Sequence, residues 1–207
     1  MARKWFGILV LAMMTLVVAN AAAQKWEVAG SVGRIFISDQ GVANTNLFNS
    51  NVHFGDQLTY EANGGRRIVD IGIASLSVEV PFVFSFDQKV NFEENLVPKS
   101  FNSFFVTPSV RLNLFPMTAF SPWISGGGGW GRFDESSTLE DGGKNPGATG
   151  TNCGVAQVGL GLDVRILHGF KLRGEVRDFY SGVPQLNVPT VTRQHNIFAG
   201  GGLVWQF

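Results

Sequence analysis

The sequence predicts an all-β fold, a single eight-stranded antiparallel up-and-down transmembrane β-barrel. Apolar and polar residues alternate with a period of two along most of the chain, as they do in strands with two different faces. The connections between these segments are alternately short and long, as in membrane barrels. Charged residues make up only 15% of the chain, whereas soluble domains contain about 25%. Together these features favour strands that face lipid over a soluble sheet.

Residues 1–23 have the features of a secretory signal peptide. Two basic residues precede an almost wholly apolar run over 5–18, and three alanines follow at 21–23. The apolar run has roughly 14 residues, whereas a membrane-spanning helix needs about 20. We therefore expect the signal to be cleaved and the mature barrel domain to cover residues 24–207.

The clearest alternation runs from Ala74 to Asp87. Its even positions are all apolar and include Phe82, Phe84 and Phe86, whereas its odd positions are mostly polar. Adjacent strand residues point to opposite faces, so this segment has one apolar and one mostly polar face. The same alternation recurs over 103–114, 152–166 and 170–177.

Eight strands are expected along the mature chain, at 25–37, 53–62, 68–86, 101–115, 120–134, 152–167, 170–181 and 194–207. The second has the weakest alternation. In the third, Asp70 falls on the apolar face, which predicts a β-bulge or a change of phase near the start of that strand. In the fifth, the run from Gly126 to Gly129 hides which residues share a face.

The expected connections are short at 63–67, 115–118 and 167–169, and longer near 38–52, 87–100, 135–151 and 182–193. Outer-membrane barrels have short periplasmic turns and long outer loops. An even number of strands then places both termini on the periplasmic side. The long loops, 135–151 above all, are the expected surface for partners, since loops commonly carry binding functions.

The mid-strand charges lie on the polar faces, and this decides which face points outward. In a soluble lipocalin-like barrel the apolar faces fill the interior, and the phenylalanines of the third strand would crowd eight strands. We therefore expect the apolar faces to contact lipid. Three charged residues on these faces, Arg34, Asp56 and Asp178, fall near strand ends, where a charge next to lipid costs little.

Aromatic residues are expected to form two girdles at the membrane interfaces. The periplasmic girdle would contain Trp26, Phe115, Trp123 and Trp205. The outer girdle would contain Phe36, Phe84, Phe86, Trp130, Phe133 and Tyr180. The alternative is a soluble protein in which aromatic residues fill a core.

The polar faces supply an expected lumen network of five acidic and four basic residues: Glu27, Glu61, Glu79, Asp163 and Glu175 with Arg111, Arg165, Arg173 and Arg177. In a narrow interior these charges must pair, because an unpaired buried charge is costly. We expect them to plug the barrel. The alternative is a gated polar path for small solutes, and a wide pore is not expected from eight strands.

No catalytic, cofactor or metal site is expected. The three histidines and the single cysteine, Cys153, are too scattered for a metal site and allow no internal disulfide. His53 and His195 are expected near the outer rim with Ser50 and Ser181 as neighbours, but their spacing does not indicate a catalytic triad.

No nucleotide or nucleic-acid partner is expected either. The run Gly126–Gly129 lacks the Lys-Ser/Thr ending and the following helix of a phosphate-binding loop. No basic run or stripe indicates a nucleic-acid partner.

The chain ends with alternating apolar residues, Leu203, Trp205 and the final Phe207. This segment resembles the C-terminal signature of outer-membrane barrels. The segments Val158–Arg165 and Leu172–Asp178 are similar to the sixth and seventh strands, and Pro122–Trp130 to the fifth strand, of small OmpA-type and OmpW-type barrels.

The resemblance implies an integral protein of the cell outer membrane. Its partners would be the outer-membrane lipid and the barrel assembly machinery, which would recognise Leu203, Trp205 and Phe207. We expect a monomeric, non-enzymatic barrel with a structural or surface-interaction role. Two alternatives are a path for small or hydrophobic molecules, as in OmpW-type barrels, and a lipid A-modifying enzyme.

Overall fold

The computed structural model describes residues 26–42, 51–92, 96–190 and 192–207. The expected signal peptide, 1–23, lies outside the described residues. The strands are β1 (Trp26–Ile37), β2 (Gln40–Gly41), β3 (Asn51–Phe54), β4 (Gln57–Asp70), β5 (Ala74–Asn91), β6 (Ser100–Val106), β7 (Ser109–Leu114), β8 (Phe120–Glu135), β9 (Thr151–Leu167), β10 (Phe170–Ser181) and β11 (Gln194–Gln206). Among the described residues, no helix is long and apolar enough to cross a membrane.

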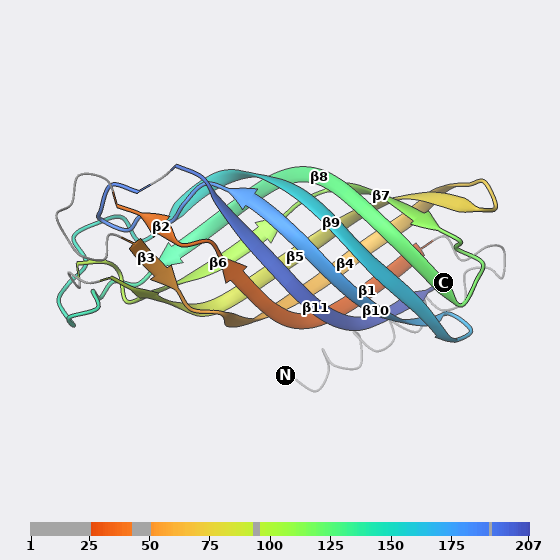
Figure 1. The fold of residues 1–207 in the computed structure, drawn as a ribbon, viewed down its shortest axis with the longest axis horizontal. Helices are drawn as coiled ribbons and strands as arrows, with labels where there is room; N and C mark the ends of the chain where they lie inside the picture. The colour runs from red at the N-terminus through yellow and green to blue at the C-terminus, as the bar shows by residue number, and fades with distance from the viewer. Residues whose placement is uncertain (1–25, 43–50, 93–95, 191) are drawn as a thin grey trace, which may run out of the picture.

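The strands form a closed antiparallel barrel (Figure 1). β6 and β7 are two halves of one strand, interrupted at Thr107 and Pro108, where the proline has no N–H to donate to the ladder. Counted as one, they complete a ring of eight strands with β1, β4, β5, β8, β9, β10 and β11. The first strand pairs with the last, Glu27 opposite Gln206 through Ile37 opposite Asn196. The predicted all-β eight-stranded fold is confirmed.

The stagger of the strands fixes the width of the barrel. A path that starts at Glu27 and follows directly paired residues through each strand returns to β1 at Ile37. This stagger of about ten residues tilts eight strands by about 40° and gives a backbone radius of about 8 Å. An interior this narrow has room for side chains and for no wide pore.

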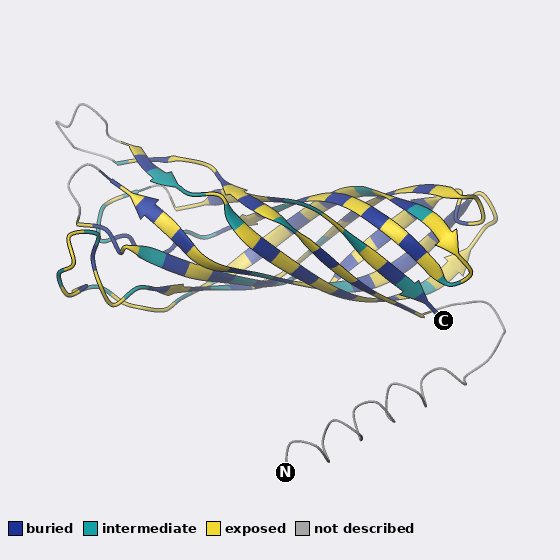
Figure 2. Cartoon of the chain, turned by 90° about the horizontal axis from the view of Figure 1, so that it is seen from below, coloured by how far each residue is buried: buried dark blue, intermediate teal, exposed yellow. Residues whose placement is uncertain are grey.

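Inward and outward residues alternate along every strand of the barrel wall (Figure 2). The outward residues are large and apolar: Val158, Leu160 and Ile124 on β8 and β9 are 68%, 60% and 61% exposed. The inward residues on the same strands include buried Ser125, Gln157 and Asp163. At these positions the apolar residues therefore face out and the polar residues face in, as the alternation predicted.

The first predicted turn is wrong. Residues 63–67 lie within β4, and the turn is Ile71–Ile73. Gly65 fits the strand because it faces the Glu27 side chain, which a Cβ at that position would touch at 3.1 Å. The true turn has Gly72 with a φ of 80°, which favours glycine. The irregularity predicted near Asp70, at the start of the third strand, is present instead at the end of β4, as a register shift between Arg67 and Val69.

The second expected strand is interrupted. Residues 53–62 belong to the end of β3 and the start of β4, which are separated by Gly55 and Asp56. β3 pairs with β2 and with the end of β5, so β2 and β3 extend the sheet beyond the closed ring at this end of the barrel. β5 itself continues to Asn91, beyond its expected end at 86. We refer to this side as the loop end of the barrel and to the opposite side as the turn end.

Candidate functional site

The lumen contains a polar zone, which lies toward the turn end. Eight of the nine residues predicted to face the lumen are buried there, namely Glu27, Glu61, Glu79, Arg111, Asp163, Arg173, Glu175 and Arg177. The prediction for Arg165 is wrong, because this residue is exposed beyond the turn end of the lumen. It donates to the Pro116 and Met117 carbonyls at 3.0 and 3.2 Å. Lys171, 5% exposed, takes the fourth cationic position and lies 4.0 Å from Asp163.

Arg111 and Arg173 hold the turn-end part of this zone together. Arg173 binds both oxygens of Asp163, at 2.8 and 2.9 Å, and reaches Glu27 at 3.2 Å. Arg111 also pairs with Glu27, and its Nη1 lies 2.9 Å from Glu79. Two guanidinium groups thus share one carboxylate, and this sharing joins β1, β5, β7, β9 and β10 across the lumen.

Arg177 forms the loop-end part of the same zone. Its Nη1 donates to Glu79 at 2.8 Å, and its Nε lies 3.0 Å from Glu175 and 3.2 Å from Glu61. Glu79 therefore links Arg177 to Arg111. The charged side chains form one continuous network rather than separate pairs.

Trp123 lies at the centre of this network, contrary to its predicted place in the periplasmic girdle. It is 2% exposed, and its Nε1 donates to Asp163 at 3.1 Å. The guanidinium carbons of Arg111, Arg173 and Arg177 lie 5.6, 5.2 and 4.9 Å from the ring centre. Such cation–π contacts are each worth about 0.5–2 kcal/mol, with the larger values in desolvated sites.

Polar side chains support the carboxylates unevenly. Ser31 donates to Glu175 at 2.6 Å, Asn63 to Glu79 at 3.0 Å, and Gln206 to Glu27 at 3.1 Å. Neither oxygen of Glu61 accepts a hydrogen bond from the described residues. Since five carboxylates share four cations, Glu61 is the member that the network supports least.

An apolar zone fills the loop-end half of the lumen. The rings of Phe105 and Phe179 stack with centroids 5.2 Å apart, and Phe133 packs edge-on against Phe105 at 5.8 Å. Ile35 and Phe198, on other strands, are also fully buried. This zone was not predicted, and Phe133, expected in the outer girdle, is fully buried inside the barrel. The apolar zone therefore closes the lumen on the loop-end side of the charged network.

The turn-end mouth of the lumen is narrow. Glu27, Lys171, Gln206 and the turn around Pro116 line a cavity of about 10 Å³. This is about the space that one water molecule occupies. The cavity between these side chains therefore has no room for a solute larger than water.

The histidine and serine candidates do not assemble. His195 faces outward at the loop end, where its Nδ1 lies 2.7 Å from Asp178. Ser181 faces the lumen and donates to the Gly182 carbonyl at 2.6 Å. His53 pairs with Asp39 at 2.8 Å, and Ser50 lies outside the described residues. No group of three metal-ligating side chains forms among the residues that the structure describes.

The remaining charged residues predicted on the apolar faces are paired at the loop end. Arg34 pairs with Asp56, and the two side chains are 61% and 46% exposed. The hydrogen bond and the charge of Arg34 hold the pKa of the Asp56 carboxyl below its usual value. Asp178 pairs with His195, as described above. Each of these three residues therefore has an ion-pair or hydrogen-bond partner.

Outward aromatic residues mark two levels on the barrel wall. Trp26 and Phe36, on β1, are 51% and 48% exposed and ten residues apart. Because the strand is tilted by about 40° from the barrel axis, this separation corresponds to about 25 Å along the axis. At the turn end Trp205 stacks with Phe170, with centroids 6.3 Å apart. Leu203 and Trp205 face outward with them, and Phe207 packs on Trp205 at 4.9 Å. The two levels are spaced like the girdles that bound an apolar band of about 25 Å in membrane barrels.

No protein-family model matches the sequence, and no curated protein matches it significantly. Solved structures do match. The structure of Neisserial surface protein A is 15% identical with a TM-score of 0.59, and the match covers 91% of this chain and 100% of that chain. The outer membrane protein OprG of Pseudomonas aeruginosa is 13% identical with a TM-score of 0.54, over 89% and 96% of the two chains.

The N-terminal β-barrel domain of Pseudomonas aeruginosa OprF is also 13% identical, with a TM-score of 0.51 over 89% of this chain and 98% of that chain. At these identities the likeness concerns the fold. The chain has the fold of the small eight-stranded outer-membrane β-barrels, as the resemblance in its strands predicted.

Proposed function

We propose that this chain is an integral outer-membrane protein with a plugged lumen, and that it has a structural or surface-interaction role rather than an enzymatic one. One observation carries the proposal. A band of exposed apolar side chains, bounded by aromatic residues about 25 Å apart, surrounds a barrel whose charges face inward. A bilayer is the surrounding that matches a band of this height and polarity.

The lumen supports a plug rather than a channel. A solute that entered from the turn end would have to separate the ion pairs of Arg111, Arg173 and Arg177. It would then meet the stacked rings of Phe105 and Phe179. Both barriers lie within a backbone radius of about 8 Å.

The loop end supports a surface-interaction role. Glu135 accepts hydrogen bonds from the Thr151 hydroxyl at 2.7 Å and from the Gln185 backbone at 2.8 Å. Asn187 donates to Asn145 at 2.9 Å. These bonds join the connections 135–151 and 182–193, which the sequence alone did not predict to be ordered. A surface held in one conformation loses less entropy when a partner binds.

The proposed orientation places the turn end and both termini in the periplasm. The N-terminal strand and the last residue meet there, since Trp26 N donates to the Phe207 carbonyl at 3.0 Å. Leu203 and Trp205 lie on β11 and Phe207 directly follows it, and the edge of β11 would be free before it pairs with β1. We propose that the assembly machinery recognises these residues, and that the mature barrel is a monomer.

The experiment is a heat-modifiability assay combined with planar-bilayer recording. We expect the protein in outer-membrane fractions, with an unheated band that migrates faster than the boiled band and no stable conductance. A soluble periplasmic protein without a shift would refute the membrane assignment. A shifted band with a stable open conductance would refute the plug and support a path for small molecules.

A further inference from the structure

A groove lies on the outward wall of the barrel near the loop end, where β5, β6 and β8 run side by side. It has a volume of about 410 Å³, and most of its lining is apolar. Three phenylalanines, Phe84, Phe86 and Phe104, form its walls. The ion pair of Arg132 and Asp134 lines its loop-end side, which we call the upper side of the groove.

The groove exists because opposed rings turn away from each other. Phe84 and Phe104 are direct partners across β5 and β6. Phe84 stacks instead on Tyr60, with centroids 5.6 Å apart, and also meets Phe86 at 5.8 Å. Phe104 packs edge-on against Trp130 at 5.9 Å. Each ring is held from its far side, so the space between the two rings stays open.

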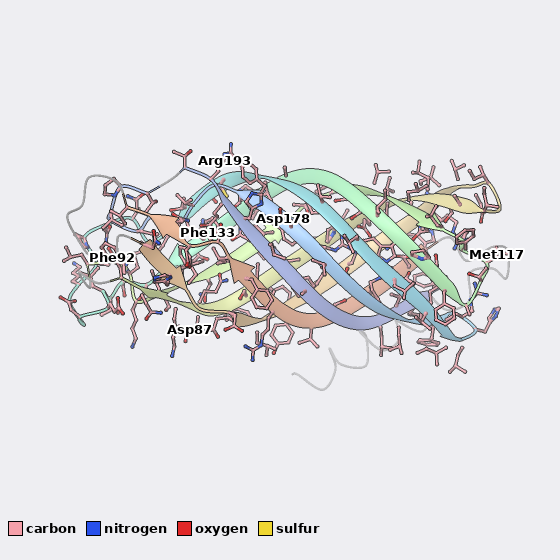
Figure 3. The ribbon with its side chains drawn as sticks, viewed as in Figure 1. Asp87, Phe92, Met117, Phe133, Asp178 and Arg193 are labelled. Atoms are coloured by element: carbon pink, nitrogen blue, oxygen red, sulfur yellow. The ribbon has the colours of Figure 1, made fainter. Side chains whose placement is uncertain are left out.

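A break in the strand ladder adjoins the groove, whose lining includes Phe86 and Asn102. The pairing of β5 with β6 shifts between Ser85 and Gln88. Asp87, within the break, has a φ of 49°, and its backbone N–H donates to the Asn102 side chain at 2.8 Å. Figure 3 shows Asp87 on the outer wall near the loop end. Because the Asn102 amide holds the bulge, the groove is a built feature of the wall.

The upper side of the groove presents both signs of charge. Arg132 Nε lies 2.7 Å from Asp134 Oδ1, and the two side chains are 42% and 51% exposed. Gly150, which has no side chain, lies beside the free end of the guanidinium. Arg132 therefore keeps terminal nitrogens for an anion, and Asp134 keeps an oxygen for a cation.

We propose that this groove binds one lipid through an acyl chain and selects a zwitterionic phosphoethanolamine headgroup. The acyl chain would lie between Phe84 and Phe104, the phosphate against Arg132, and the ammonium against Asp134. A guanidinium suits a phosphate because its N–H groups form charge-assisted hydrogen bonds with phosphate oxygens. The inference rests on the proposed membrane location, which brings lipid to this height on the wall.

The test is native mass spectrometry of the purified folded barrel with phosphatidylethanolamine, phosphatidylglycerol and phosphatidylcholine of identical chains. We expect phosphatidylethanolamine to be retained about fivefold more than the other two, since partly exposed charge pairs contribute modestly. Arg132→Gln and Asp134→Asn should each abolish the preference. Free phosphoethanolamine, which has no acyl chain, should not be retained.

The matched control is Arg34→Gln, which removes another exposed arginine from an ion pair with an aspartate at the loop end, on β1 and outside the groove. It should keep the preference. Equal retention of the three lipids, equal effects of Arg34→Gln and Arg132→Gln, or equal binding of the free headgroup would overturn the inference. A heat-modifiable barrel without lipid preference refutes this site alone, whereas a protein without heat modifiability refutes the proposed function.

Discussion

Two buried glutamates of the lumen differ in how the network supports them, and the same substitution at each tests the network. Glu79 lies 2.9 Å from Arg111 and 2.8 Å from Arg177, and it accepts a hydrogen bond from Asn63 at 3.0 Å. Glu61 has one ion-pair contact, 3.2 Å from Arg177, and accepts no hydrogen bond from the described residues. Glu79→Gln and Glu61→Gln are isosteric changes in the same lumen.

The two changes should have very different effects on the free energy of unfolding. Glu79→Gln leaves two buried arginines short of a carboxylate, and removing one partner of a buried pair costs about 3–5 kcal/mol. Glu61→Gln leaves Arg177 with Glu79 and Glu175 and makes four carboxylates share four cations. Its cost should stay within about 1 kcal/mol, and a gain in stability is compatible with the charge count.

The assay is reversible urea unfolding in phospholipid vesicles, followed by tryptophan fluorescence and by the folded fraction on unheated gels. Both variants must first show the heat-dependent shift. Equal losses at the two positions would refute the claim that the network distributes its support unevenly. A larger loss for Glu61→Gln would show that the carboxylate with the fewest contacts is the more important one, and the assigned pairing would be wrong.

Three further perturbations test other parts of the structure. Trp123→Phe should cost about 2–4 kcal/mol of unfolding free energy, because it removes a hydrogen bond to a charged group and weakens the cation–π contacts. The control Trp130→Phe, on the outer wall, should cost less than about 1 kcal/mol. Similar losses for the two variants in urea unfolding would contradict the inward assignment of Trp123. Phe105→Ala should cost about 3–5 kcal/mol and produce conductance in planar bilayers, and a silent bilayer would show that the polar zone alone closes the lumen. Because Arg34 lowers the pKa of Asp56, this ion pair is present above the ordinary carboxyl pKa and is lost as pH falls through the lowered value. Arg34→Gln should therefore raise the pKa of Asp56 in a carbon-13 NMR titration. An unchanged titration of Asp56 would contradict the pairing.

The direction of the strand faces could be predicted from the sequence because alternation with a period of two has only two phases. In β5 the charge of Glu79 and the rings of Phe82 and Phe86 sit on opposite phases, so one assignment fixes the whole strand. The buried positions of Glu27, Arg111 and Arg173 follow from the same reasoning on their own strands. Arg165 has the correct phase but lies past the turn end of the lumen. The phase of a residue carries no information about its position along the barrel axis.

The fifth expected strand shows where the alternation stops being readable. Ile124, Ser125 and four glycines separate Trp123 from Trp130, and no side chain carries the phase across Gly126–Gly129. The sequence interpretation placed both tryptophans outward, although an odd separation of seven residues puts them on opposite faces of a regular strand. The neighbours Ser121 and Ser125 share the phase of Trp123 and are the signal that would have placed it inside.

The apolar zone of the lumen could not be predicted from the rule that polar residues face in. Phe105, Phe133 and Phe179 all share the inward phase of polar residues nearer the turn end of their strands. Their position along the barrel axis, not their phase, distinguishes these phenylalanines from the inward polar residues. That position depends on the stagger between strands. The stagger follows from pairings between residues far apart in the sequence, such as Phe36 with Ile197.

The inward glycines explain how a narrow barrel accommodates so many long side chains. Arg177 is paired directly with Gly159, Arg173 with Gly202, and Glu175 with Gly161. At Gly161 an added Cβ would overlap the Trp123 ring. A shift of two residues between strands would therefore bring long side chains opposite each other while leaving the outward faces equally apolar. Lipid contacts cannot select the register, so the alternation of large and small residues inside the lumen must select it.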